Sequence, residues 1–327
     1  MWVPKRGTSG HILAPQEGVI DLGTTISDLQ ITEVIDGDTI RVETDDGEES
    51  LRLACVDTEE SRSGSSKPVT RAGKEASEMA KQYFAAGGGG LDRVDIEFDT
   101  DDPVEVCLVK HRDNFGRLLC YVHKGEENFN LKLTREGWSP YFVKYGRSRL
   151  YDGQFMAAEA EAQAKRSVIW DPDYNGAGQR RDYYRLVPWW WLRASVVEDY
   201  RRLARPEYPV LSVRLDYQTL LERIPTDDIV TVLCDLQEGV KRWPGGAVVY
   251  AGSPQHKFNL WIPNAPNGEM EQLIELIEKR YSGQDEESYS GLGRGYVYVS
   301  GDVTDYEGKP QIVLRGVNQL SDIPPGS

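Results

Sequence analysis

The sequence predicts a protein of the α+β class that is mostly β, with two β-rich units joined by an aromatic, basic helical linker. At 327 residues the chain is longer than one small hydrophobic core organises. Short runs of alternating apolar and polar residues, typical of half-buried strands, recur in both halves of the chain. We therefore expect an N-terminal extension at 1–27, a first unit at 28–172, a linker with a helix at 173–208 and a second unit at 209–325.

The first unit is expected to contain strands followed by helices. Residues 31–44 alternate around an Asp-Gly turn, which predicts a hairpin. Residues 74–86 carry apolar side chains at helical spacing before a run of four glycines, and residues 153–166 form an alanine-rich helical pattern. A short helix is expected to end at Gly137. The remaining predicted strands are 49–58, 93–99, 104–110 and 116–123.

The linker pattern at 189–209 predicts an amphipathic connecting helix. It begins with three consecutive tryptophans, Trp189 to Trp191. These rings could stack on bases, as aromatic platforms do, or wedge the two units together. The wedge is the favoured interpretation, because adjacent residues of a helix point in different directions.

The second unit has the element order of an OB-type barrel, which is three strands, a helix and two strands. The final hairpin also resembles the last two strands of many nucleic-acid-binding OB domains. We therefore expect a second five-stranded barrel of the OB type. Its predicted elements are strands at 229–239, 245–252 and 256–263, a helix at 269–281 and a hairpin at 295–316.

Composition limits the functions that need to be considered. The net charge of −15 argues against a protein that coats nucleic acid through bulk positive charge. Residues 28–60 hold twelve Asp or Glu against two Arg, whereas residues 109–149 hold nine Lys or Arg against four Asp or Glu. A solvated acidic surface would explain the total charge but not this local reversal. No C-x-x-C spacing is present, so a zinc site is not expected.

The cysteines and the chain start suggest an ordinary reduced, non-membrane protein. All four cysteines lie in apolar runs and are expected to be buried thiols, with a Cys107–Cys120 disulfide as the alternative. No run of 18 apolar residues exists, so nothing is expected to span a membrane. The first residues lack the apolar region of a signal peptide. The cytoplasm is the default expectation, and secretion is expected only if a leader has been removed.

Two segments near the start bring hard oxygen ligands and an arginine together. VIDGDT at 34–39 and LRLACVDTEES at 51–61 are expected on neighbouring strands. Oxygen ligands suit Ca²⁺ or Mg²⁺, and a planar guanidinium suits a phosphate. DNFGRLLCYV at 113–122 supplies a second arginine. Such groups can perform phosphodiester hydrolysis. The candidate residues are Asp36, Asp38, Arg52, Asp57, Thr58, Glu60 and Arg117.

These motifs carry a resemblance. VIDGDT, the R-x-x-x-x-D-T-x-E pattern of 52–60, GKEAS at 73–77, FGR at 115–117 and AEAEAQAKRSVIW at 158–170 occur in this order in the staphylococcal (thermonuclease-type) nuclease family. Together they are highly specific, and they cover roughly residues 28–172. The resemblance implies a five-stranded β-barrel of the OB type with three helices. It also implies Ca²⁺-dependent, sugar-nonspecific cleavage of DNA and RNA.

The resemblance assigns roles to individual residues. It places Ca²⁺ on the side chains of Asp38 and Asp57 and on the backbone carbonyl of Thr58. Glu60 is then the general base, or the group that orients the attacking water. Two arginines clamp the scissile phosphate and stabilise the transition state. The arginines are Arg52 and Arg117. The residues expected to stack on a base are Phe115 and either Tyr141 or Tyr145, of which Tyr145 is favoured.

The sequence departs from the family pattern beside the proposed base. Glu59 stands where proline is usual, and its added negative charge is expected to raise the pKa of Glu60. The stretch from Phe98 to Phe115 is longer than in short family members, so the loop before Arg117 could be remodelled. Phe115 replaces a common tyrosine, which keeps the stacking face and loses the hydroxyl.

Two classes of function remain open at this stage. The leading hypothesis is a nuclease whose second unit assists substrate binding. The alternative is a non-catalytic adaptor built on the same fold, which binds nucleic acid or protein. Adaptors usually lose the acidic ligands or the arginines, and here both are present, which favours the enzyme. The second unit could also serve only structure or protein interaction. The core of the first unit is expected to lie entirely upstream of Trp170.

Overall fold

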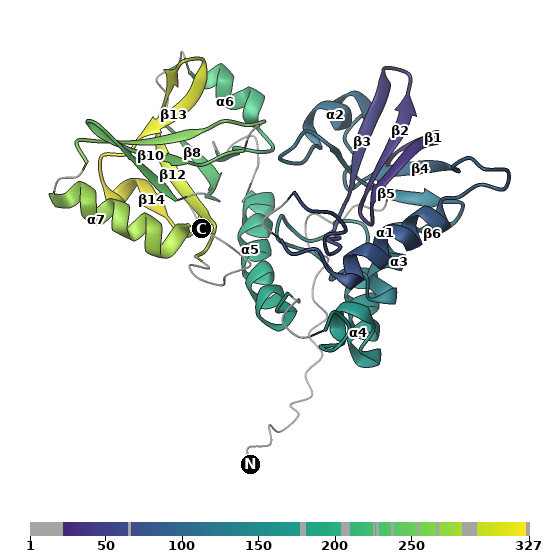
Figure 1. Ribbon diagram of the computed structural model, residues 1–327. Helices are drawn as coiled ribbons and strands as arrows, with labels where there is room; N and C mark the ends of the chain where they lie inside the picture. Colours follow the sequence, from purple (N-terminus) through teal and green to yellow (C-terminus); the bar gives the residue numbers. More distant parts are fainter. Residues whose placement is uncertain are drawn as a thin grey trace, which may run out of the picture.

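The structure, a computed structural model, places two β-sheets on either side of one long helix (Figure 1). It describes residues 22–64, 67–176, 181–203, 210–224, 226, 229–236, 239–253, 255–265, 268–282 and 293–324. Most of the expected N-terminal extension, 1–27, lies outside this range. No described helix is long and apolar enough to cross a membrane.

The first sheet closes into a barrel. Its strands follow the order β3-β2-β1-β4-β5-β6, and a parallel pairing of β3 with β5 joins the two sides. The tight turn between β1 and β2 is the predicted Asp-Gly hairpin. The expected five-stranded barrel is therefore confirmed. The five barrel strands are β1 (Thr24–Asp36), β2 (Thr39–Thr44), β3 (Gly47–Leu53), β4 (Arg93–Phe98) and β5 (Leu118–Lys124). The short strand β6 (Glu127–Asn128) pairs with β5 outside the closed ring.

Helices pack around this barrel. The helices predicted near 74–86, before Gly137 and at 153–166 are confirmed, but the strand predicted at 104–110 is wrong because these residues form a helix. A closed barrel leaves no sheet edge free between β4 and β5, so the alternating apolar pattern has no strand to pair with. The helices are α1 (Arg71–Tyr83), α2 (Val104–Lys110), α3 (Phe129–Glu136), α4 (Asp152–Lys165) and the 3₁₀ turn Val168–Trp170.

The second sheet has eight strands in the order β7-β8-β12-β13-β11-β10-β9, with β14 beside β12. The predicted strands, helix and hairpin are present, although β8 ends earlier than predicted and β9 is a separate strand. β7, β14 and α6 were not predicted. The strands are β7 (Val210–Ser212), β8 (Ile229–Asp235), β9 (Val240–Trp243), β10 (Gly246–Tyr250), β11 (Asn259–Pro263), β12 (Tyr296–Tyr306), β13 (Lys309–Val313) and β14 (Leu320–Ser321). The helices are α6 (Tyr217–Arg223), α7 (Gly268–Leu276), the π-helical turn Ile277–Tyr281 and the 3₁₀ turn Val317–Gln319.

The linker helix α5 (Tyr183–Leu203) is buried on two sides. Tyr183, Leu186 and Trp190 belong to the core of the first barrel, whereas Val197 and Tyr200 pack in a cluster with side chains of the second sheet. The helix is therefore not simply amphipathic, and the interpretation of the tryptophans as a wedge is confirmed. The expectation that the first core ends upstream of Trp170 is wrong, because α5 supplies part of it.

All four cysteines are free thiols, so the alternative Cys107–Cys120 disulfide is wrong. Cys107 lies on α2 and Cys120 on β5, and both are fully buried. Burial raises the pKa of the Cys120 thiol well above its ordinary value. These side chains therefore act as small apolar groups of the core.

Helix α4 carries a buried acid that couples the first unit to pH. Glu159 accepts a hydrogen bond from the backbone N–H of Tyr141 at 2.9 Å. Burial raises the pKa of Glu159 to about 7, and this hydrogen bond only partly opposes the shift. The folded protein therefore holds the proton of the Glu159 carboxyl group more tightly than the unfolded chain does. The resulting stabilisation of the fold is complete below the pKa that Glu159 has in the unfolded chain, and it is lost as pH rises through 7.

We expect Glu159→Gln to flatten this part of the stability profile, since glutamine can still accept the hydrogen bond from Tyr141. Relative to the variant, the wild-type unfolding free energy should fall by about 3 kcal/mol between about pH 4 and pH 8. Urea denaturation at several pH values measures this difference. Glu161→Gln, on the exposed side of the same helix, is the control and should keep the wild-type profile. Parallel profiles for wild type and Glu159→Gln would contradict the assignment.

Candidate active site

The predicted site residues lie in one cleft between the barrel and the second sheet. The cleft has a volume of about 1810 Å³. Its barrel side is lined by the ends of β1, β2 and β3 and by the segment that follows β3. All of the predicted catalytic, metal and substrate residues line it, namely Asp38, Arg52, Asp57, Thr58, Glu60, Phe115, Arg117 and Tyr145.

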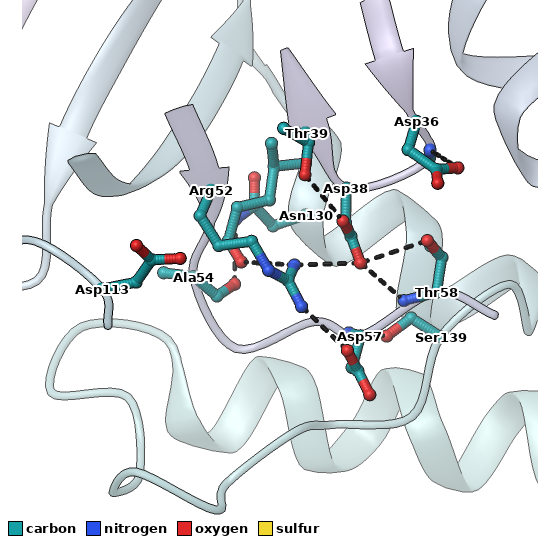
Figure 2. Close-up of polar contacts among 12 residues, drawn as sticks. Asp36, Asp38, Thr39, Arg52, Ala54, Asp57, Thr58, Asp113, Asn130 and Ser139 are labelled. Carbon is teal, nitrogen blue, oxygen red and sulfur yellow. Dashed lines mark hydrogen bonds and ion pairs between the residues drawn. The ribbon is translucent and has the colours of Figure 1, made fainter. Parts of the chain in front are cut away.

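Arg52 lies between two carboxylates at the centre of the site. Its two terminal nitrogens are 2.9 Å from Asp38 Oδ2 and 2.9 Å from Asp57 Oδ1 (Figure 2). Asp38 Oδ2 also accepts hydrogen bonds from the backbone N–H and the hydroxyl of Thr58. Gly37 makes this approach possible, since a Cβ there would lie 2.9 Å from the Thr58 hydroxyl oxygen. The two acidic motifs predicted to be neighbours are therefore in direct contact.

Buried polar side chains hold the backbone from Ala54 to Asp57 in place. Cys55 adopts a positive φ of 62°, which turns the chain sharply after β3. Asn130 donates to the carbonyl oxygen of Ala54 at 2.9 Å, and Ser139 accepts from the backbone N–H of Asp57 at 2.8 Å. Both Asn130 and Ser139 are fully buried. These contacts hold Asp57 in place independently of any ligand.

Asp57 is surrounded by positive charge. Besides Arg52, it is 3.0 Å from Lys67 Nζ and 2.7 Å from Arg181 Nη1. Burial alone would raise the pKa of Asp57, but Lys67, Arg181 and Arg52 outweigh it and hold the pKa well below its ordinary value. The carboxylate therefore stays ionised across the working pH range and carries a permanent negative charge in the cleft.

Arg117 is joined to the same network through Thr39. Its Nη1 donates to the Thr39 hydroxyl at 3.1 Å, and that hydroxyl donates to Asp38 Oδ1 at 3.1 Å. Asp113 holds the other side of the guanidinium at 2.6 Å. Arg52 thus approaches the cleft from β3, and Arg117 from the turn just before β5. Each keeps a carboxylate partner that a phosphate could replace.

Glu60 and Glu59 have separate environments. Glu60 lines the cleft, 3.9 Å from Lys67 Nζ. Its pKa is raised, mainly by burial, with Asp57, Asp38 and Asp36 adding to the effect and Lys67 opposing it. The expected effect of Glu59 is not among the main causes of this shift, because the Glu59 side chain points elsewhere.

Glu59 is buried and has a structural role. Its carboxylate accepts hydrogen bonds from Thr70 at 2.6 Å, Asn175 at 2.6 Å and Tyr183 at 3.1 Å. Thr70 in turn caps α1 by accepting from the N–H of Gly73. Glu59, which departs from the family pattern, therefore connects the start of α1 to Asn175 and to the start of α5.

Two aromatic residues predicted to contact substrate lie at the cleft surface. The Phe115 side chain is 72% exposed, and its ring is 5.4 Å from the Arg117 guanidinium carbon. Tyr145 is half-buried beside Arg214 of the second unit, whose guanidinium carbon is 5.3 Å from the ring. Tyr141, by contrast, is fully buried and stacks on Phe155, so it is a core residue.

Sequence reasoning missed Arg181 as a member of the site. It lies in the basic stretch before α5, its side chain is 1% exposed, and its guanidinium carbon is 5.5 Å from the rings of Tyr183 and Trp190. A basic stretch in a linker gives no sign of this role. Only the packing of α5 against the barrel brings Arg181 to Asp57.

The donor set fits a hard cation that keeps several waters. Asp38 and Asp57 contact the same guanidinium, and Thr58 lies next to both. Among the described residues, no group of three or more His, Cys, Asp or Glu side chains could hold a metal ion. Two carboxylates and a backbone carbonyl would leave coordination positions for water and substrate, as a catalytic Ca²⁺ requires.

Comparison with known proteins identifies relatives of the first unit. The family described as staphylococcal nuclease homologue matches residues 50–172. The thermonuclease of Staphylococcus hyicus is 34% identical over 142 residues, which cover 43% of this chain and 74% of that protein. The thermonuclease of Staphylococcus intermedius is also 34% identical, over 143 residues with the same coverage. The endonuclease YncB of Bacillus subtilis is 31% identical over 140 residues, covering 43% of this chain and 60% of that protein.

We expect Asp57→Asn to destabilise the fold even without a metal, because Arg52, Lys67 and Arg181 would lose their shared counter-charge. Breaking such a buried pair should lower the unfolding free energy by about 3 kcal/mol or more. Urea denaturation in EDTA measures this loss. Asp199→Asn is the control, since Asp199 pairs with Arg202 on the exposed surface of α5 and its loss should change stability by less than about 0.5 kcal/mol. An Asp57→Asn variant as stable as wild type would show that the three cations do not depend on this carboxylate.

Proposed function

The chain belongs to the staphylococcal nuclease family and is a nuclease, and we propose that it hydrolyses phosphodiester bonds of DNA and RNA with Ca²⁺ as its metal ion. One observation carries the proposal. Arg52 bridges Asp38 and Asp57 at 2.9 Å each, and Glu60 and Arg117 line the same cleft. An acidic pair, a separate carboxylate and two arginines are the groups that phosphodiester hydrolysis needs.

In this proposal each side chain has a defined task. Glu60 accepts the proton of the attacking water, and its raised pKa brings it closer to the pH at which a general base works best. Arg52 and Arg117 exchange their present carboxylate partners for the phosphate oxygens. They then stabilise the negative charge that increases on the phosphate in the transition state.

The metal is assigned to the oxygen donors described above. Asp38, Asp57 and the backbone carbonyl of Thr58 would hold Ca²⁺, which supplies positive charge against a phosphate oxygen. Asp36 is a turn residue in this assignment, because its carboxylate accepts from the N–H of Gly37 at 2.8 Å. The permanently ionised state of Asp57 supports its role as a ligand.

We also propose that the second unit is an OB-type barrel that assists substrate binding. Its strand pairing supports this. β11 and β13 are parallel, as β3 and β5 are in the first barrel. β8 pairs with β12, and β9 pairs with β10. β8 and β9 together therefore occupy the position that β1 alone holds between β4 and β2 in the first barrel. The second unit thus differs from the first barrel in that its first strand is split into β8 and β9.

Replacing either arginine should impair catalysis much more than folding. Arg52→Ala and Arg117→Ala should each lower kcat by about 10²–10³ or more, as loss of a preorganised transition-state donor does. Arg52→Lys should recover little, because lysine cannot make the bidentate contact. Initial rates on DNA and on RNA measure the effect. The control is Arg41→Ala on β2, which removes an exposed ion pair with Glu33 and Glu48. Near wild-type rates in both arginine variants would rule out the phosphate clamp.

Hydrolysis should require Ca²⁺ and stop in excess EDTA, which a gel assay with and without the ion detects. Calorimetric titration of Ca²⁺ into the substrate-free protein provides a second readout. Asp38→Asn should weaken this binding by about 10-fold or more, because ligand charge sets Ca²⁺ affinity. Asp101→Asn is the control, since Asp101 lines the cleft but is mostly exposed and lies outside the cluster. Full activity in EDTA would rule out the metal assignment.

A further inference from the structure

The wall of the cleft opposite the nuclease site is the outer face of the second sheet. Strand register places Lys241, Val248 and Trp261 side by side across β9, β10 and β11. The alternate residues of the same strands, such as Val249, Leu260 and Ile262, point inward and form the core. The outward residues that line the cleft include Lys241, Trp243, Tyr250, Trp261, Tyr306 and Lys309. We call this set the outer platform.

The rings of the outer platform lie at the surface instead of filling the core. Trp243 is 55% exposed and Tyr306 is 49% exposed. The Trp261 ring extends across the sheet over Gly246, where a Cβ would lie 2.5 Å from the ring atoms. Lys241 Nζ is 4.6 Å from the centre of the Tyr250 ring. Aromatic and cationic side chains therefore alternate over one open surface.

Charge is segregated within the second unit. Residues 210–325 hold seventeen Asp or Glu and ten Lys or Arg. Of the residues of this unit that the structure describes along the cleft, four are cations and none is a carboxylate. The four cations are Arg214, Lys241, Lys257 and Lys309. An acidic unit thus presents its basic and aromatic side chains toward the nuclease site.

We propose that the outer platform is a binding site for single-stranded nucleic acid, whose backbone continues into the nuclease site. This inference rests on the proposed function and adds a substrate class to it. Aromatic rings bind bases by stacking against their flat faces. Those faces are accessible in a single strand and are covered by neighbouring base pairs in a duplex. The platform therefore distinguishes the two by stacking, while its lysines contact the phosphates of either.

The barrel side of the cleft continues the same surface. Phe115, beside Arg117, and Tyr145 both lie at the cleft surface. Arg214 of the second unit donates to the carbonyl oxygen of Tyr145 at 3.3 Å. A strand bound to the platform can thus reach the arginines without leaving the cleft. A volume of about 1810 Å³ accommodates several nucleotides, in keeping with the roughly 4–16 that one OB-type barrel contacts.

The test is fluorescence anisotropy in EDTA with a labelled thymidine strand of about 20 nucleotides and with the same strand annealed to its complement. We expect the wild type to bind the single strand about 10-fold or more tightly than the duplex. Equal affinities would overturn the single-strand assignment. Failure to bind either probe would overturn the platform as a nucleic-acid site and point to a protein as its partner.

Variants then locate the site. Trp243→Ala and Trp261→Ala should each weaken single-strand binding by about 5- to 100-fold, and Trp261→Phe should recover most of the loss because it keeps a stacking face. Tyr184→Ala is the control, since Tyr184 is 77% exposed on α5 and does not line the cleft. Wild-type affinity in both tryptophan variants would contradict the proposal.

A matched pair of neighbours on β9 tests the charge. Lys241 faces the cleft, whereas Arg242 faces the opposite side and pairs with Glu271 and Glu278. Lys241→Gln should reduce the slope of log affinity against log salt by about 0.7, as loss of one phosphate contact on a single strand does. Arg242→Gln should leave the slope unchanged. Equal slopes in the two variants would overturn the placement of the phosphates.

These experiments test the binding proposal and the cleavage proposal separately. The anisotropy measurements are made without metal and need no hydrolysis. A protein that binds the single strand selectively but never cleaves it, with Ca²⁺ present, would refute the proposed function and support the outer platform. A protein that cleaves both strand types equally, with no effect of the tryptophan variants on binding, would support the nuclease and overturn the platform.

Discussion

The arrangement of the whole molecule depends on the burial of helix α5 between two cores. Trp190 fills the side toward the barrel, and Tyr200 packs toward the second sheet. The fully buried Arg193 adds an ion pair to Asp235 at 3.0 Å, and its guanidinium carbon is 4.2 Å from the centre of the Tyr296 ring. A helix held in this way fixes the distance and angle between the two sheets. The cleft therefore exists as a shape before any ligand arrives.

The same helix also completes the electrostatics of the site. Arg181 lies just before α5 and reaches Asp57, while Glu59 accepts from Tyr183 at the start of the helix. Asp57 is thus balanced by cations from β3, from the loop before α1 and from the linker. A buried carboxylate with such partners is already desolvated and oriented. Ligand binding then needs an exchange of partners instead of a rearrangement of the backbone.

Much of the first barrel and of its candidate site could be predicted from sequence, because both depend on local patterns. The Asp-Gly turn, the alternating strands and the two acidic motifs specify their structure within about ten residues each. The predictions from sequence were wrong where contacts between distant parts of the chain determine the structure. Residues 104–110 have the pattern of a strand, but the closed barrel offers them no partner. Glu59 looked like a neighbour of Glu60, yet its carboxylate turns to Thr70 and Tyr183. Arg181 gave no signal, since its role depends on how α5 packs.

The segregation of charge in the cleft has a consequence for the speed of encounter. The chain carries a net charge of −15, so a polyanion approaching from a distance is repelled before it meets the lysines of the platform. Salt screens that repulsion beyond a Debye length of about 10 Å at 0.1 M. It also weakens each phosphate contact once the strand is bound. Added salt therefore accelerates association while it shortens the lifetime of the complex, the reverse of electrostatic steering by a basic nucleic-acid-binding protein.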